Sequence, residues 1–161
     1  MAYLLDANVF IQAKNLHYGF DFCPAFWDWL VANNTQQKVF SIEKVADEID
    51  AGADELTDWA VDRGARFFLK PDPTIFPALT TVSTWVTNQK FDPVAVSTFL
   101  QVADYYLVSY ALAHGHTVVT HEKALSSPKK IKIPNVCIGL NIKCMTPFEM
   151  LRRERARFVL G

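Results

Sequence analysis

The sequence contains no apolar run long enough to cross a bilayer, and it opens on an apolar stretch without the basic segment of a secretory signal. Its three cysteines show no C-x-x-C spacing, so neither a disulfide framework nor a cysteine zinc site is expected. Repeats and low-complexity tracts are also missing. These absences predict a cytoplasmic protein with reduced thiols and no membrane partner.

The composition is that of a folded protein. Half of the 161 residues are apolar and a fifth are charged, which excludes a disordered chain. This length is ordinary for one domain with a proper core, and no composition shift marks a boundary. We therefore expect a single domain over residues 1–161.

Short apolar stretches alternate with helical patterns along the chain. Strands are expected at residues 3–5, 38–40, 66–69, 117–120 and 135–140. Helices are expected at 8–17, 24–34, 42–51, 53–63, 78–88, 94–101, 103–114 and from Thr146 through Arg157. Ser41 is expected to cap the helix at 42–51. This order predicts an α/β fold, a parallel β-sheet flanked by helices in a Rossmann-like three-layer sandwich.

Asp6 directly follows the apolar run Tyr3-Leu4-Leu5. A carboxylate at the end of a core strand needs a compensating cation, a helix N-terminus or a metal ion, because burying an unpaired charge is costly. Ligands of open α/β sheets bind at the carboxyl ends of the strands. The alternative is that Asp6 or Asn8 only caps the next helix.

Three further acids are expected near that edge of the sheet. At about 100° per residue, Glu48 lies about 60° from the apolar Val45 on its helix. Asp104 is in register with an apolar helical face, and Glu122 follows a strand. Each acid taken alone is better explained as a cap or a solvated residue, and it is the convergence of four acids in a parallel sheet that favours a site. The acids at four-residue spacing indicate a solvated stripe: Asp50, Asp54, Asp58 and Asp62.

A cluster of carboxylates stays ionised only if a cation neutralises it. Oxygen ligands favour Mg²⁺ or Mn²⁺ over zinc, and such ions promote phosphodiester cleavage. Asn8 and Thr120 are candidate neutral oxygen donors. The histidines are more typical of a solvated loop than of a zinc site: His114, His116 and His121.

Positive charge gathers at the end of the chain. Residues 1–122 carry 7 basic and 15 acidic side chains, whereas residues 123–161 carry 9 basic and 2 acidic ones. The candidates for binding RNA backbone, or an acidic protein segment, are Lys129, Lys130, Lys132, Arg152 and Arg153. A solvated basic surface is the alternative.

The pattern resembles the PIN-domain ribonucleases, in particular the toxins of VapBC-type toxin–antitoxin pairs and their PIN-like relatives. The resemblance lies in LLDANVF at 4–10, SIEKVADEI at 41–49, ADYYLVSYALAHG at 103–115 and TVVTHEKAL at 117–125. It implies an acidic quartet of Asp6, Glu48, Asp104 and Glu122, with Asp6, Asp104 and Glu122 as metal ligands. Asn8 and Thr120 would support them. In the family the fourth acid is usually Asp in T-x-D, where this chain has Glu122.

That resemblance also implies Mg²⁺ or Mn²⁺ dependence, cleavage of single-stranded RNA, a homodimer and inhibition by a cognate antitoxin. Two alternatives stay open. One is a phosphatase with Asp6 as the nucleophile, although such enzymes carry a second Asp where Asn8 stands and a Lys near the late acids. The other is a PIN-like module that binds RNA or protein without catalysis.

Overall fold

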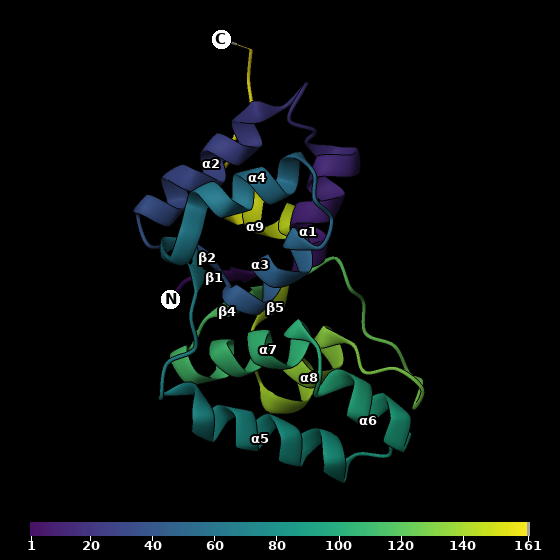
Figure 1. The fold of residues 1–161 in the computed structure, drawn as a ribbon. Helices are drawn as coiled ribbons and strands as arrows, with labels where there is room; N and C mark the ends of the chain where they lie inside the picture. The colour runs from purple at the N-terminus through teal and green to yellow at the C-terminus, as the bar shows by residue number, and fades with distance from the viewer. Residues whose placement is uncertain (161) are drawn as a thin grey trace.

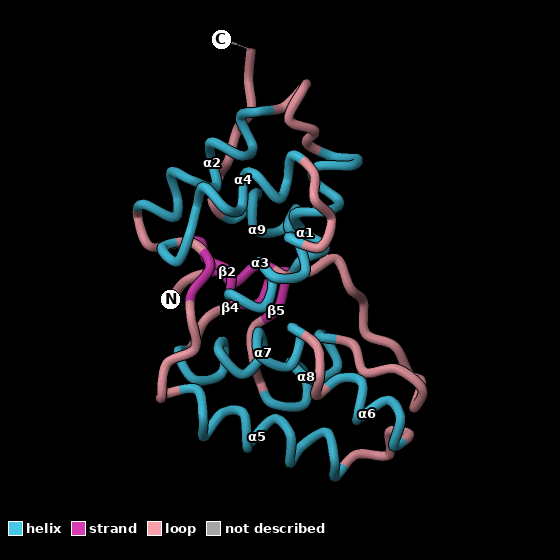
Figure 2. The backbone as a smooth tube through the Cα atoms, viewed as in Figure 1, coloured by secondary structure: helices cyan, strands magenta, loops and turns pink. Residues whose placement is uncertain are grey.

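The computed structural model describes residues 1–160. Within them the chain forms a five-stranded, all-parallel sheet between two groups of helices (Figures 1 and 2). The strand order is β3-β2-β1-β4-β5. Their bounds are β1 Tyr3–Leu5, β2 Val39–Ile42, β3 Phe68–Leu69, β4 Thr117–Val119 and β5 Cys144–Met145. The predicted α/β fold with a parallel sheet flanked by helices is confirmed.

The helices lie on both faces of this sheet. Their bounds are α1 Ala7–Gln12, α2 Pro24–Thr35, α3 Glu43–Asp50, α4 Glu55–Arg63, α5 Ile75–Asn88, α6 Pro93–Phe99, α7 Ala103–His114, α8 Ile133–Leu140 and α9 Pro147–Arg153. A π-helical turn, η1 (Ala13–His17), continues α1, and a 3₁₀ turn, η2 (Gly64–Arg66), follows α4. Figure 1 shows α1, α2, α4 and α9 on one side of the sheet, and α5 to α8 on the other. Across residues 1–160, no helix combines the length and the apolar character needed to traverse a membrane.

The central strand β1 explains why the sheet forms here. Leu4 and Leu5 are fully buried, as expected for a parallel strand covered by helices on both faces. Tyr3 pairs with Val39 of β2 on one side and with Thr117 of β4 on the other. The ends of β1 and β4 therefore lie side by side, and so do the residues that follow them.

The expected strand at 135–140 is wrong, because this segment is helix α8. Pro134 occupies its first turn, and Ile133, Val136 and Cys137 are buried at helical spacing. Asn141 ends the helix in the left-handed conformation. The last strand is β5, whose two residues are too few to leave a pattern in the sequence.

Three local expectations also need correction. Ser41 does not cap α3, since it lies within β2 and its hydroxyl donates to the Leu5 carbonyl over 2.6 Å. The expected helix at 8–17 turns from α to π geometry after Gln12. The terminal helix stops at Arg153, so that Arg155 and Arg157 lie outside it.

Candidate carboxylate site

Asp6 lies at the carboxyl end of β1 with only 3% of its surface exposed. Its side chain makes no capping hydrogen bond to α1, although its backbone occupies the cap position. Instead, the Thr120 hydroxyl donates to Asp6 Oδ2 over 2.8 Å and accepts the Glu122 N–H over 3.0 Å. The Thr120 hydroxyl thus fixes the orientation of the Asp6 carboxylate, and it joins the ends of β1 and β4.

The four predicted acids meet at this edge. Asp104 comes from the first turn of α7, Glu48 from α3, and Glu122 from the segment after β4. Asp6, Glu122 and Glu48 all lie close enough to Asp104 for their negative charges to raise its pKa. The parallel sheet therefore collects four carboxylates that are far apart in the sequence.

Burial raises the pKa of Asp6, Glu48 and Asp104, and repulsion by neighbouring acids adds to the rise at Asp6 and Asp104. Burial raises the pKa of Asp6 to about 6, helped by the charges of Glu122 and Glu48 and opposed by the Thr120 hydrogen bond. Burial also raises the pKa of Asp104 to about 8, and the other three acids add to this rise. Partial desolvation raises the pKa of Glu48, although its outer surface is exposed. The Ala103 N–H, at the start of α7, opposes that last rise.

Glu122 links the acids to the segment that carries the lysines. Its Oε1 accepts the N–H of Ile133, the first residue of α8, over 2.9 Å. The segment between β4 and α8 runs along one side of the molecule towards α6 (Figure 1), where the Asp92 N–H donates to the Pro128 carbonyl. Asp104, Glu122 and the three lysines line one open cavity of about 370 Å³: Lys129, Lys130 and Lys132.

Among the lysines of this segment, Lys132 is the one whose charge affects Asp104. Its positive charge opposes the rise in the pKa of Asp104, which burial and the three neighbouring carboxylates produce. Lys129 and Lys130 are more exposed. The sequence analysis grouped these lysines as candidates for binding, and in the structure they line the same cavity as Asp104 and Glu122.

Two predicted groups do not reach the acids. Asn8 is exposed in the first turn of α1, and no hydrogen bond joins its side chain to another part of residues 1–160. Arg152 and Arg153 are exposed in the last turn of α9. Burial raises the pKa of Tyr3, and the charge of Arg153 opposes that rise, which places Arg153 near the start of β1 rather than its end. The predicted basic surface is therefore divided between two places.

The donor atoms of these acids are of the type that a hard divalent cation binds. They are carboxylate oxygens, and two of the carboxyls have a pKa raised by negative neighbours, a repulsion that a divalent cation would relieve. As the side chains stand, no group of three His, Cys, Asp or Glu residues within 1–160 is arranged to hold a metal. One oxygen of Glu122 is already committed to Ile133. The acids therefore offer donor atoms of the right type for a divalent cation, but their side chains are not arranged around a metal position.

An aromatic cluster forms around His121, the neighbour of Glu122 in the sequence, and its two other rings were not expected from the sequence. The His121 ring lies 5.6 Å from that of His17 and 5.6 Å from that of Phe148, between ring centroids. Burial lowers the pKa of His121, and the charge of His17 adds to this effect. The only signal in the sequence was that His121 sits between Thr120 and Glu122, because the other two rings come from distant segments.

The tryptophans, by contrast, belong to the core. Trp27 is buried and packs edge-on against Trp59 at 5.0 Å between centroids. Trp29, Trp59 and Trp85 are partly buried against the hydrophobic core. These four rings therefore contribute to packing of the core.

A comparison with known families gives one match that covers nearly the whole chain. The family model described as "Domain of unknown function (DUF4411)" matches residues 3–158. The chain belongs to the DUF4411 family. Searches of curated proteins and of solved structures gave no match. Since the DUF4411 description specifies no activity, the chemistry of this chain has to be argued from its carboxylates.

Proposed function

We propose that this DUF4411 chain is a metal-dependent endoribonuclease of PIN-like type that cleaves single-stranded RNA in the cytoplasm. The observation that carries the proposal is the meeting of Asp6, Glu48, Asp104 and Glu122 at the carboxyl edge of a parallel sheet. Neighbouring negative charges raise the pKa of Asp6 and Asp104, which costs the fold free energy, and perturbed groups of this kind cluster at functional sites. The resemblance of the sequence to PIN-domain ribonucleases supports the same assignment.

Each side chain has a distinct role in this proposal. Asp6, Asp104 and Glu122 would hold Mg²⁺ or Mn²⁺, which lowers the pKa of a bound water and offsets charge on the scissile phosphate. Glu48, at the solvent-exposed rim, would orient the attacking water or complete the ligand set. Thr120 fixes the orientation of the Asp6 carboxylate through its hydroxyl. Lys132, beside Asp104, would contact a phosphate of the RNA backbone.

The proposal extends to partners. The PIN-like resemblance implies that the chain is the toxin of a toxin–antitoxin pair, and that it forms a homodimer. Arg153 is exposed and lies near the start of β1, away from the acids, which supports contact with an acidic segment of an antitoxin rather than with RNA at the site. Arg152 is also exposed, and its charge reaches Tyr18, next to His17. Lys129 and Lys130 are better placed for RNA, since they line the same cavity as Asp104 and Glu122.

The direct test is cleavage of a mixed pool of labelled single-stranded RNAs by the purified protein. We expect cutting with Mn²⁺, no cutting with EDTA, and loss of cutting in an Asp6→Asn/Asp104→Asn double variant. Asp47→Asn is the matched control, because Asp47 is an exposed acid on the same helix as Glu48. Cutting that survives in the double variant, or that fails equally in the control, would contradict the proposal.

An aspartyl phosphatase is the second candidate, and one observation favours it. The alternative required a lysine near the late acids, and Lys132 acts on Asp104. Against it, the position two residues after Asp6 is the exposed Asn8 rather than a second acid. Hydrolysis of p-nitrophenyl phosphate without RNA cleavage would support the phosphatase. Absence of both activities, with RNA binding retained, would support a non-catalytic module.

A further inference from the structure

The π-helical turn η1 holds His17 in a defined place. In this turn the Tyr18 N–H donates to the Ala13 carbonyl five residues back, over 2.7 Å. Such turns are rare and often occur at functional sites. A wider turn positions side chains differently from an α-helix of the same sequence. Here it ends on a histidine that is exposed.

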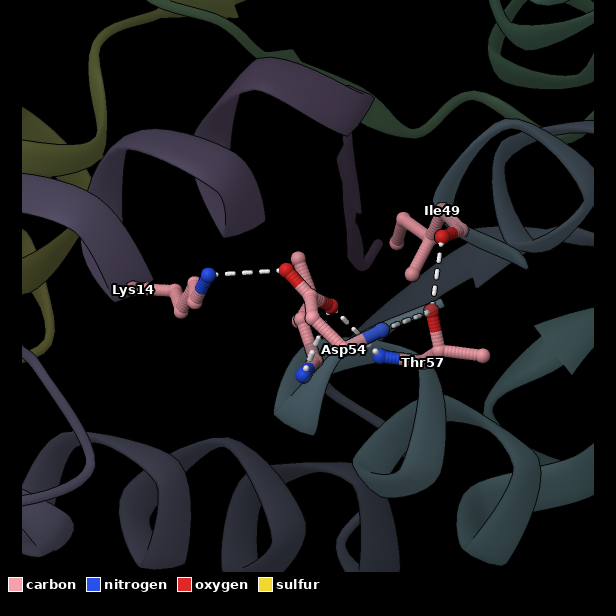
Figure 3. A network of polar contacts seen from close by, with 5 residues as sticks. Lys14, Ile49, Asp54 and Thr57 are labelled. Carbon is pink, nitrogen blue, oxygen red and sulfur yellow. Dashed lines mark hydrogen bonds and ion pairs between the residues drawn. The ribbon is translucent and has the colours of Figure 1, made fainter. Parts of the chain in front are cut away.

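Contacts on both sides of His17 fix this turn. Figure 3 shows that the Lys14 ammonium reaches Asp54, over 2.7 Å, where Asp54 caps α4. On the other side, the Tyr18 ring stacks on Phe26 with centroids 4.4 Å apart and planes at 11°. The Tyr18 carbonyl also accepts the Trp27 indole N–H over 2.7 Å. His17 therefore lies between two anchored neighbours.

Three rings from distant segments meet at this point. His17 packs edge-on against Phe148 at 5.1 Å between centroids, and His121 lies 5.6 Å from each of them. Phe148 stands in the first turn of α9, which a capping box of Thr146 and Glu149 holds in place. His17 is exposed, whereas the rings of His121 and Phe148 are half-buried. Together the rings offer aromatic surface to solvent.

The location of these rings relates them to the acids. In the sequence, His121 lies between Thr120 and Glu122. The Thr120 hydroxyl donates to Asp6, and the Glu122 carboxylate accepts the N–H at the start of α8. The lysine-bearing segment continues from Glu122 to Lys132 along the cavity that Asp104 also lines. One flank of the carboxylates is thus positively charged, and the aromatic cluster is connected to them through the backbone of His121, which joins Thr120 to Glu122.

We propose that His17, His121 and Phe148 form a base-stacking platform for single-stranded RNA, which holds one nucleobase beside the phosphate to be cleaved. The inference rests on the proposed nuclease function and specifies how its substrate binds. Lysines that contact phosphates and aromatic rings that stack on bases are the two parts of a single-strand binding site. Stacking accepts any base, because every base has a π-face.

The test measures binding rather than turnover. The probe is a short oligouridylate with one 2-aminopurine, whose fluorescence falls when the base stacks. All proteins carry Asp104→Asn, so that the probe stays intact. We expect quenching with this background protein, and affinity about tenfold lower with loss of quenching after Phe148→Leu or His17→Ala. Phe148→Tyr, which keeps the ring, restores both.

Two controls separate stacking from other effects. Phe76→Leu changes an aromatic side chain that is 60% exposed on α5, and it should leave binding unchanged. Lys132→Ala should lower the slope of affinity against salt by about one, whereas the ring variants should leave that slope as it is. Circular dichroism checks that Phe148→Leu is folded; if it is not, His17→Ala decides, since its side chain is exposed.

The outcomes distinguish this inference from the nuclease proposal. If the unmodified protein cuts RNA and the ring variants bind and quench as the background protein does, the platform is overturned while the nuclease stands. If quenching depends on the rings and the unmodified protein cuts nothing, the platform stands and the nuclease fails. Absence of both cutting and binding overturns both.

Discussion

Asp54 and Asp104 both stand at the start of a helix, and their surroundings give them opposite properties. Asp54 caps α4, accepts two backbone N–H groups and meets Lys14, and the Lys14 hydrogen bond leads the lowering of its pKa. Asp104, in the first turn of α7, has a pKa of about 8 because it is buried and faces three acids. The position on a helix is therefore not what sets the behaviour of an acid. Asp54 stabilises the fold, whereas Asp104 costs stability and is better explained by a function.

The largest expected difference between Asp104 and Asp54 is in how much each contributes to stabilisation of the protein by a divalent cation. At a Mn²⁺ concentration one hundred times its dissociation constant, we expect the free energy of unfolding to rise by about 2.7 kcal/mol. The Asp6→Asn/Asp104→Asn variant should lose this gain, and Asp54→Asn should keep it. Scanning calorimetry with and without Mn²⁺ measures the shift. An equal shift in all three proteins would show that the ion binds elsewhere.

The next effect concerns the metal-free protein. Because the folded pKa of Asp104 lies above its usual 3.8, the folded state holds a proton between these values. Stability therefore falls as pH rises from about 4 to about 8. Asp104→Asn should raise the free energy of unfolding at pH 9 by about 2 kcal/mol, and the gain should vanish near pH 4. Urea unfolding in EDTA at several pH values measures this. A loss of stability at pH 9 would contradict the repulsion described for the site.

Asp54 should behave in the opposite way. Replacing this cap by Asp54→Ala should lower the free energy of unfolding by about 1 kcal/mol at pH 7. The pKa of Asp54 is lowered, so its contribution is present above pH 3.8 and is lost as pH falls through the folded pKa. Asp58→Ala, on the exposed side of α4, is the control. Equal losses from both substitutions would mean that the capping box contributes nothing particular.

The smallest effect is that of the ion pair alone. Lys14→Met should lower the free energy of unfolding by about 0.5 kcal/mol, because both side chains are partly exposed and water screens them. The loss should shrink further at high salt. Urea unfolding at low and high ionic strength gives the comparison. A loss that salt leaves unchanged would point to packing of the lysine stem instead.

Much of the fold was predictable because its signals are local. Leu4 and Leu5, followed at once by Asp6, indicated a buried parallel strand that ends in a polar site. The helix expected at 103–114 is α7, and Gly115 ends it in the left-handed conformation. The segment 135–140 was misassigned because a short apolar run fits either a strand or a helix, and packing decides. Gly139 shows that packing, since any side chain there would collide with Trp85.

Only the part of the site that follows from the topology of the sheet could be predicted from the sequence. Parallel strands bring their carboxyl ends together, which predicted the meeting of Asp6 and Glu122 without any coordinates. The position of Lys132 beside Asp104 depends on the path of an irregular segment. The aromatic cluster depends on a π turn and on the packing of α9, and neither leaves a periodic signal. The exposed position of Asn8 shows that a motif match does not establish a contact.

The central place of β1 has a consequence for folding. The hydrogen bond from Thr120 to Asp6 spans 114 residues, and the pairing of β1 with β4 spans the same separation. Contacts between residues so far apart form late, because a large loop must close before they contribute. The carboxylates therefore assemble only when β4 docks against β1. A nascent or partly folded chain does not carry the assembled carboxylates, so the activity proposed for them would begin only after β4 has docked.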